Sequence, residues 1–532
     1  MDTIIALFTG VDKYATVSVM SNVGKVSSCF TAAPIGYDGQ LVEVECDMKA
    51  GLPALQIVGM GSKAIDEAKE RVRSAIANSQ LDFPAKKFVI NLAPAELPKD
   101  GTHYDLAIAV AILASSNQLQ QYEIKDAMFA GELGLDGRLR PVRGIISIAE
   151  TAQSCGKTTL YLPAENTTQA ELIDGLTLIP VRNLKELFLH LKGEVKLPVH
   201  TPSSNPMSHK SHTEPALDDV LGQEQAKRAL IIAAAGHHNI LFTGSPGAGK
   251  TMLARVLPSL LPPLTTREQV AVTKLHSLTG DSIDTVITKR PFRSPHHTSS
   301  RISLVGGGNP PKPGDISLAH HGVLFLDEIP EYPRATLESL RQPLEDRQVM
   351  ISRANGHALY PANFMLIATM NPCPCGYYGD TTRECSCSST QILKYQQRLS
   401  GPLLDRIDLV VQVGRIDNAA LVSHMPAGNN SQHIDAQKRI RLALKHQLNR
   451  YSNSNQNNIY NSGAVSKDIA TRLLLSQSAK QLLTQATDRM GLSARSYFKV
   501  IKVARTIADL EGSPEIQTHH IAEALQYRLV AK

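Results

Sequence analysis

The chain has 532 residues, 42% hydrophobic and 20% charged, with a formal net charge of +6, which is the composition of a soluble globular protein of about three domains. The charge is too small to establish a polyanionic partner, and an aromatic content of 5% without tryptophan argues against a platform of rings for stacking bases. No run approaches the ~20 apolar residues that span a membrane, and the first residues lack the basic segment of a signal peptide, so we expect a cytoplasmic protein without membrane contact.

The N-terminal third of the chain shows strand and helix signals in turn and predicts one compact α/β domain over residues 26–195. Val42, Val44 and Cys46 alternate with acidic residues, which is the period-two pattern of a half-buried strand. Further apolar patterns predict a helix at 65–76, a strand at 88–92 and a buried helix at 106–113. Proline, serine and histidine residues without periodicity then predict a linker at 196–215.

The octapeptide Gly-Ser-Pro-Gly-Ala-Gly-Lys-Thr at 244–251 is a complete phosphate-binding loop between an apolar run at 239–243 and a helical pattern. Its glycines let backbone N–H groups surround phosphates at a helix N-terminus, where the helix dipole favours negative charge. Lys250 is expected to reach the terminal phosphates of a nucleoside triphosphate, and the Thr251 hydroxyl to hold magnesium. The predicted nucleotide-binding residues are therefore Gly244, Ser245, Pro246, Gly247, Ala248, Gly249, Lys250 and Thr251.

Two further strands end in polar residues that suit an ATPase site. The apolar run 322–326 ends in Asp327 and Glu328. We expect Asp327 to hold the magnesium and Glu328 to polarise the attacking water, the alternative being two solvated acids at a strand end. The next run, 364–369, precedes Asn371, whose amide can hydrogen-bond the γ-phosphate or the water.

Four of the seven cysteines crowd into fifteen residues, which suits a metal site in a reducing cytoplasm better than a disulfide framework. They form a C-x-C…C-x-C pattern made of Cys373, Cys375, Cys385 and Cys387. Four thiolates in a short polar loop suit tetrahedral zinc, and a site with protein ligands alone is structural. Because the spacing is tighter than the usual C-x-x-C, free thiols are the alternative.

Arg406 follows the segment Ser-Gly-Pro-Leu-Leu-Asp and is expected to enter a neighbouring subunit's site as a finger that neutralises transition-state charge. A surface ion pair with Asp408 is the alternative. From about residue 413 onward a helical period dominates, as at 470–475 and 500–507, with a predicted surface loop rich in asparagine and serine at 451–462.

Together these motifs resemble the AAA+ ATPases, with a later Gly-Leu-Ser-Ala-Arg that ends at Arg495. The linking segments are similar to the magnesium-chelatase-like proteins of the ComM/YifB type: Arg-Ser-Pro-His-His at 293–297, Leu-Val-Gly-Gly-Gly at 304–308, Pro-Gly-Asp-Ile-Ser-Leu-Ala at 313–319 and Asn-Pro-Cys-Pro-Cys-Gly at 371–376. The resemblance implies an α/β fold with an AAA+ P-loop core at 216–412 and a helical lid at 413–532. Residues 1–25 are expected to be an N-terminal extension outside it, and a start at Met20 would make residues 1–19 an artefact.

The same resemblance implies roles for single residues and an assembly. Beside Lys250 and Glu328, Asn371 corresponds to the first sensor, Arg406 to the finger and Arg495 to the second sensor on the lid. For Arg495 the sequence alone equally fits a solvent-facing arginine. ATP and magnesium are the implied cofactors, and the implied assembly is a ring of identical subunits, expected to be hexameric.

Two insertions are similar to those of chelatase ATPases and MCM-type helicases. One lies within about 280–315, and the other is 348–360, where Asn355-Gly356 between alternating strands predicts a β-hairpin. In the resembling helicases the corresponding hairpin carries a basic residue to DNA phosphates in the pore of the ring, which implies this role for Arg353. A surface hairpin with a solvated arginine is the alternative.

The domain at 26–195 also resembles the proteolytic domain of Lon, in Pro98-Lys-Asp-Gly101 and in the segment 131–138. Aligning these segments puts His103 at the position of the nucleophilic serine and Ile146 at that of the lysine. A Ser–Lys dyad needs a hydroxyl beside a base. We therefore expect no proteolysis, and a packed or surface position for His103.

Three functions follow, and the resemblance favours the first. It is a ring-forming ATPase that moves single-stranded or branched DNA, by branch migration or helicase action, during recombination of transforming DNA. The second is a chelatase-like ATPase that remodels a protein partner, although no metal-binding surface domain is appended to the chain. The third is an ATP-dependent protease, against which the missing dyad argues.

Overall fold

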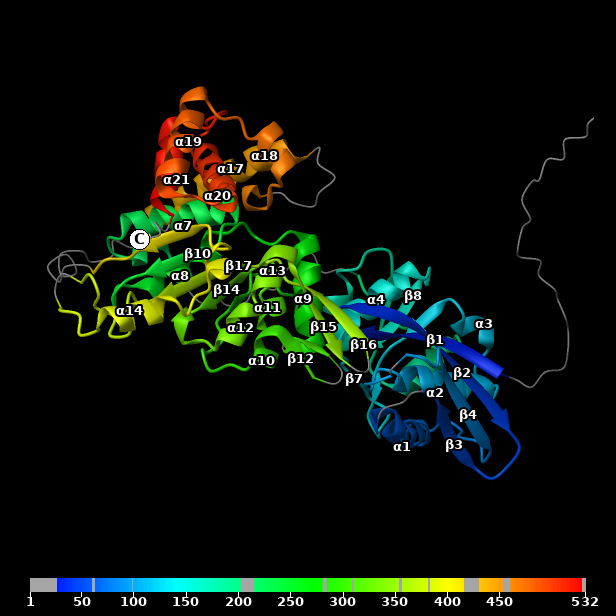
Figure 1. Ribbon diagram of the computed structural model, residues 1–532. Coiled ribbons are helices and arrows are strands. Elements are labelled where there is room, and N and C mark those ends of the chain that lie inside the picture. The colour runs from blue at the N-terminus through cyan, green and yellow to red at the C-terminus, as the bar shows by residue number, and fades with distance from the viewer. Residues whose placement is uncertain are drawn as a thin grey trace, which may run out of the picture.

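The computed structural model describes residues 26–59, 63–97, 99–201, 215–280, 285–308, 311–353, 356–380, 383–415, 430–452 and 460–528. The predicted N-terminal extension lies outside these residues, and so does most of the predicted linker, at 202–214. Figure 1 shows an N-terminal α/β body in blue and cyan, a central α/β body in green and yellow, and a helical part in orange and red packed on the central body. This arrangement confirms the predicted fold class.

The N-terminal body is built on a mixed seven-stranded sheet. Its strands, in spatial order, are β3 (Ala54–Val58), β4 (Lys87–Ala93), β2 (Asp38–Lys49), β1 (Val26–Ile35), β5 (Ala127–Phe129), β8 (Thr159–Pro163) and β9 (Thr177–Val181). Pairs β1–β2 and β2–β4 are antiparallel, and the other pairs are parallel. The helices are α1 (Lys63–Asn78), α2 (Asp105–Ser115), α3 (Gln121–Ile124), α4 (Ile145–Ser154), α5 (Thr167–Ala170) and α6 (Leu184–Leu191), and a small ribbon pairs β6 (Glu132–Leu133) with β7 (Leu139–Arg140).

The apolar patterns of the sequence explain this body. Val42, Val44 and Cys46 are fully buried along β2, while the acidic residues between them are partly exposed, as the period-two alternation predicts. Every residue of α2 is buried, in agreement with a helix that is apolar all round. The predicted helix at 65–76 and the predicted strand at 88–92 lie within α1 and β4.

The central body contains a five-stranded parallel sheet in the order β11 (Phe292–Arg293), β14 (Val323–Leu326), β17 (Met365–Met370), β10 (Ile240–Thr243) and β18 (Leu409–Gln412). All four residues of β14 and all six of β17 are buried, as expected for strands covered on both faces. The helices are α7 (Glu224–Gly236), α8 (Lys250–Leu260), α9 (Thr266–Thr279), α10 (Arg301–Val305), α11 (Asp315–Leu318), α12 (Arg334–Glu338), α13 (Arg341–Asp346), α14 (Ser389–Gln396) and α15 (Gly401–Leu404). Because all strands are parallel, their C-terminal ends meet at one edge of the sheet.

Two ribbons occupy the predicted insertions. Strands β12 (Gly306–Gly307) and β13 (Lys312–Pro313) form a short pair, and β15 (Gln348–Arg353) and β16 (Gly356–Pro361) form the predicted β-hairpin. In Figure 1 this hairpin extends from the central body toward the N-terminal body.

The helical part consists of α17 (Ser431–Tyr451), α18 (Ser466–Arg472), α19 (Gln477–Met490), α20 (Ala494–Leu510) and α21 (Thr518–Gln526). It joins the central body mainly where α17 and α20 pack on α7. Within the described ranges, no helix combines the length and the apolar character needed to cross a bilayer.

Two predictions for the helical part were wrong. The helical pattern at 470–475 ends at Arg472, because Leu475 forms a β-bridge with Ile516 and Ser476 caps the next helix by accepting a hydrogen bond from the Ala479 N–H. The segment 451–462 is not a surface loop where it is described. Tyr451 belongs to α17 and is buried, and the buried Asn461 side chain bonds Arg450, Thr506 and Asp509; residues 453–459 lie outside the described residues.

Contacts around α9 and the β-hairpin join the N-terminal and central bodies. Lys274 is buried, and its ammonium pairs with Glu150 and with Asp38 at 3.3 Å while lying 4.0 Å from the centre of the Tyr37 ring. The turn before β2 approaches the hairpin so closely that a Cβ on Gly36, whose φ is +62°, would lie 3.1 Å from the Cβ of Ala358. The two bodies are therefore joined both at α9 and at the β15–β16 hairpin.

Candidate nucleotide-binding site

The loop at 244–251 connects the C-terminal end of β10 with the N-terminus of α8, as predicted. Gly249 precedes the helix with a φ of +88°, a left-handed conformation that glycine adopts without strain. Gly244 lies against Val413, the residue that follows β18, and a Cβ on it would come within 2.1 Å of the Val413 carbonyl oxygen. The loop therefore has the backbone shape that directs N–H groups toward a phosphate.

Lys250 turns back over the loop and is buried. Its ammonium donates to the carbonyl oxygens of Gly244 at 2.5 Å and Ser245 at 3.1 Å, and to Asn371 Oδ1 at 2.9 Å. Burial lowers the pKa of Lys250 from its usual value, while the carboxylates of Asp327 and Glu328 oppose this shift. The loop lysine and the predicted first sensor are thus brought into direct contact.

Asp327 and Thr251 face each other across the ends of β14 and α8. The Thr251 hydroxyl donates to Asp327 Oδ2 at 3.4 Å, so a hydroxyl and a carboxylate are presented together. These are oxygen ligands of the type that magnesium prefers. The pair therefore fits the predicted magnesium site, with a bound ion supplying charge neutralisation beside the phosphates.

Glu328 is the residue after Asp327 and has a left-handed backbone, with a φ of +48°. Such a conformation is uncommon outside glycine and is found at active sites. Its carboxylate accepts from Asn371 Nδ2 at 3.4 Å. The predicted base and first sensor therefore contact each other as well.

Thr369, near the end of β17, was missed by the sequence analysis. Its hydroxyl donates to Asp327 Oδ1 at 2.5 Å and accepts from the backbone N–H of Glu328 at 3.0 Å, so it positions both acids. The only sequence signal was its place two residues before Asn371 at the end of a buried strand.

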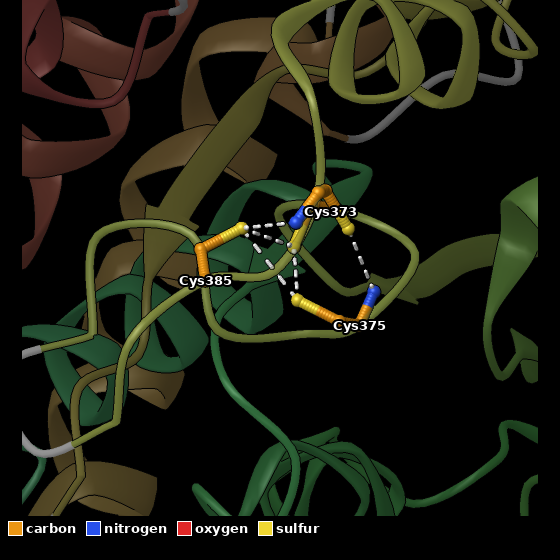
Figure 2. A group of neighbouring side chains, drawn as sticks. Cys373, Cys375 and Cys385 are labelled. Carbon is orange, nitrogen blue, oxygen red and sulfur yellow. Dashed lines mark hydrogen bonds between the residues drawn. The ribbon is translucent and has the colours of Figure 1, made fainter.

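The four cysteines of the predicted zinc site lie together beside this edge of the sheet. Their sulfur atoms are all within 4.8 Å of one another. Figure 2 shows Cys373, Cys375 and Cys385 facing one another within their loop. Only Cys373 is fully buried.

Arg406 and Arg495 are brought together by a residue that the sequence analysis did not single out, Glu345. The Arg406 guanidinium pairs with Glu345 at 2.7 Å, and Arg495 at the start of α20 pairs with the same carboxylate. The predicted alternative, an ion pair between Arg406 and Asp408, is not what forms: Asp408 pairs instead with Lys499 at 2.8 Å.

These two arginines lie at the opposite edge of the sheet from the loop. The Arg406 carbonyl accepts from the side chain of Asn239, the residue just before β10, whereas the loop begins just after β10. Four strand residues at ~3.3 Å each separate the two points by about 13 Å. The arginine edge and the nucleotide edge of one chain are therefore distinct.

A cavity of about 380 Å³ lies at the arginine edge, between the central sheet and the lid. Its lining is rich in cationic side chains and also contains two acids; these residues are Arg347, Arg406, Arg495, Lys499 and Lys502, with Glu345 and Asp408. Burial lowers the pKa of Lys502 to about 8. This edge thus concentrates positive charge.

Arg353 is the last residue of β15, and its backbone pairs with Gly356 across the hairpin. Its side chain and the linking residues 354 and 355, including the predicted turn residue Asn355, lie outside the described parts of the structure.

In the N-terminal body, the two positions aligned with a proteolytic dyad are both buried. The His103 ring lies 4.0 Å from the Tyr104 ring, and burial lowers the pKa of His103 to about 4. Ile146 lies fully buried in α4. His103 is therefore a packed residue, which is one of the two positions predicted for it, the other being the surface.

Comparison with known proteins gives three successive family matches. Residues 216–421 match the family described as magnesium chelatase, subunit ChlI; residues 44–166 match subunit ChlI of Mg-chelatase; and residues 428–528 match the C-terminal part of that subunit.

Full-length relatives are also similar. The competence protein ComM of Haemophilus influenzae is 41% identical over 510 residues, which cover 94% of this chain and 97% of that protein. The uncharacterised protein YifB of Salmonella typhimurium is 41% identical over 502 residues, 94% of this chain and 96% of that protein. YifB of Escherichia coli is 41% identical over 507 residues, 95% and 97% of the two chains.

Proposed function

The chain belongs to the magnesium-chelatase-like AAA+ ATPases of the ComM/YifB type, and we propose that it is a ring-forming motor that couples ATP hydrolysis to movement along DNA. In this proposal Lys250 and the loop bind ATP, and Asp327 and Thr251 hold magnesium. Glu328 polarises water, Asn371 senses the γ-phosphate, and the motor works in the cytoplasm on single-stranded or branched DNA.

The observation that supports a ring is the separation between the nucleotide edge and the arginine edge of the central sheet. The Arg406 backbone lies at the N-terminal end of β10, whereas the phosphate-binding loop begins at its C-terminal end, and both Arg406 and Arg495 pair with Glu345. Arginines that neutralise a transferring phosphate must contact it. We infer that they serve the loop of a neighbouring subunit, which head-to-tail contacts generate around a closed ring, expected to be a hexamer. On assembly the phosphate would replace Glu345 as their partner.

The choice of DNA as the polymer rests on two further observations. The relative from Haemophilus influenzae is named a competence protein, which supports branch migration or helicase action on transforming DNA. The β15–β16 hairpin, with Arg353 at its tip, supports a contact with the phosphate backbone inside the ring, and such contacts bind without reading sequence.

The second candidate is a chelatase-like ATPase that remodels a protein partner. The three family matches to magnesium-chelatase subunits favour it. It predicts an ATPase rate that responds to a protein partner and is indifferent to DNA.

The decisive experiment measures ATP hydrolysis and strand displacement on branched, forked and linear DNA of equal length. We expect both to rise with DNA, most on branched substrates. The same measurements on Lys250→Ala, which should not hydrolyse ATP, give the contaminating activity to be subtracted. If the ATPase rate and the strand displacement respond to none of the three DNAs, the motor proposal fails and the remodelling proposal is favoured.

A further inference from the structure

The four cysteines have the spacing of a metal site. The sulfur of Cys373 lies 3.3 Å from that of Cys375 and 3.7 Å from that of Cys385, and Cys375 and Cys385 are 3.6 Å apart. Cys387 completes the group within 4.8 Å of each. In a tetrahedron with zinc–sulfur bonds of ~2.3 Å, the sulfurs are about 3.8 Å apart. A disulfide would need ~2.05 Å, so the observed spacing is that of four separate ligands.

The backbone around the cysteines also suits thiolates. The N–H of Tyr378 donates to the Cys373 sulfur at 3.3 Å, the N–H of Cys375 to the Cys387 sulfur at 3.4 Å, and the N–H of Cys387 to the Cys385 sulfur at 3.5 Å. Such outer hydrogen bonds orient metal ligands and stabilise their negative charge.

The segment between the two cysteine pairs touches the phosphate-binding loop. Gly376, with a φ of +85°, lies so close to Pro246 that a Cβ on it would come within 2.6 Å of the proline ring. Asp380 accepts a hydrogen bond from the Ser245 hydroxyl at 2.5 Å and pairs with Arg415 at 3.5 Å. Two residues of the phosphate-binding loop, Pro246 and Ser245, therefore contact Gly376 and Asp380, which lie between the two cysteine pairs in the sequence.

We propose that Cys373, Cys375, Cys385 and Cys387 bind one structural Zn²⁺, and that this ion positions the phosphate-binding loop for nucleotide through Gly376 and Asp380. The four thiols release their protons to the solvent as they bind the ion. The ion joins the two ends of the segment and so keeps Gly376 and Asp380 against the loop. This inference rests on the proposed nucleotide site but not on DNA as the polymer.

The first test is the metal content of protein purified without chelators. We expect about one zinc per chain by elemental mass spectrometry, and its loss in Cys375→Ser and Cys385→Ser. Cys155→Ser is the matched control, because Cys155 is an exposed free thiol in the N-terminal body. Protein without zinc, with the four cysteines reduced or joined in disulfides, would overturn the proposal.

The second test is nucleotide affinity, measured with a fluorescent ATP analogue and without DNA. Chelation of the wild-type protein should weaken binding by at least about tenfold, and added Zn²⁺ should restore it. Because chelation starts from the folded protein, this arm does not depend on the cysteine variants folding. Zinc removal that leaves the affinity unchanged would overturn the positioning role.

A third variant separates the ion from its effect on the loop. Asp380→Asn leaves all four cysteines in place but weakens the acceptor for Ser245. We expect full zinc content together with several-fold weaker nucleotide binding. Wild-type affinity in this variant would contradict transmission through Asp380. Failure of DNA stimulation alone would leave all three results unchanged and would affect the proposed motor only.

Discussion

The two edges of the central sheet differ in how complete they are. At the C-terminal edge, Lys250, Asp327, Glu328, Thr369 and Asn371 bond one another directly and are positioned by one chain alone. At the other edge, Arg406 and Arg495 pair with a single carboxylate, that of Glu345. One subunit thus presents its predicted nucleotide-binding residues and its predicted finger arginine at opposite ends of β10, a strand about 13 Å long. In the proposed ring, a neighbouring subunit would bring the two together.

The largest effect is expected at the arginine edge. Arg406→Ala should lower the ATPase rate by about 10³-fold or more, the size of effect that arginine fingers have, while nucleotide binding persists. Arg439→Ala is the control, because Arg439 is an exposed arginine whose ion pair among the described residues is with its helix neighbour Asp435. Near-normal turnover in Arg406→Ala would remove this edge from catalysis.

Mixing two variants tests whether the two edges meet between subunits. Lys250→Ala damages only the nucleotide edge, and Arg406→Ala only the other. In a mixed ring roughly a quarter of the interfaces join an intact loop to an intact arginine, so activity should reappear when two inactive proteins are combined. Turnover that stays at the level of the separate variants would show that the edges do not meet between subunits.

Within the nucleotide edge, Glu328→Gln should keep ATP binding and lower turnover by about 10²–10⁴-fold, the usual contribution of a positioned base. The isosteric amide keeps the size of the side chain, so assembly with ATP should persist in size-exclusion chromatography. Normal turnover in this variant would exclude Glu328 as the base.

A smaller effect is expected at Thr369, which touches no substrate in this proposal and acts through the two acids. Thr369→Val should lower kcat/KM by about tenfold and raise the magnesium concentration needed for half-maximal rate. Thr243→Val is a matched control on the neighbouring strand, where the hydroxyl donates to the Val411 carbonyl at 3.5 Å, a long contact. An unchanged magnesium requirement would contradict the positioning role.

The smallest effect is expected away from both edges. Arg353→Ala should reduce DNA-stimulated hydrolysis a few-fold, because one phosphate contact contributes little, and should leave basal hydrolysis unchanged. The comparison is made at several salt concentrations, where the variant should show the weaker salt dependence. Equal losses of basal and stimulated rates would point to a folding defect.

Much of the nucleotide edge could be predicted because its signals are local. A strand, a glycine-rich loop and a helix are adjacent in sequence, and parallel strands bring their ends to one edge, so Asp327 and Asn371 were expected near Lys250. The α/β fold, the lid and the hairpin followed from periodicity and resemblance in the same way.

What escaped prediction depends on contacts between distant segments. Nothing in the local sequence distinguishes Thr369 from any other threonine in an apolar run until the fold brings Asp327 and Glu328 beside it. Glu345 matters only because the lid brings Arg495 back over α13. The helix predicted at 470–475 ends early because the bridge between Leu475 and Ile516 outweighs local helix propensity. A local sequence pattern cannot predict a partner about forty residues away.

The contact between Gly36 and Ala358 limits how the hairpin can act. A hairpin that swings during turnover must slide past the N-terminal body or carry it along, and Lys274 with its two carboxylates resists separation of the bodies. A movement of the hairpin is thus coupled to a movement of the whole N-terminal body. A force on the N-terminal body would therefore reach the hairpin tip, and a displacement of the tip would rotate the N-terminal body.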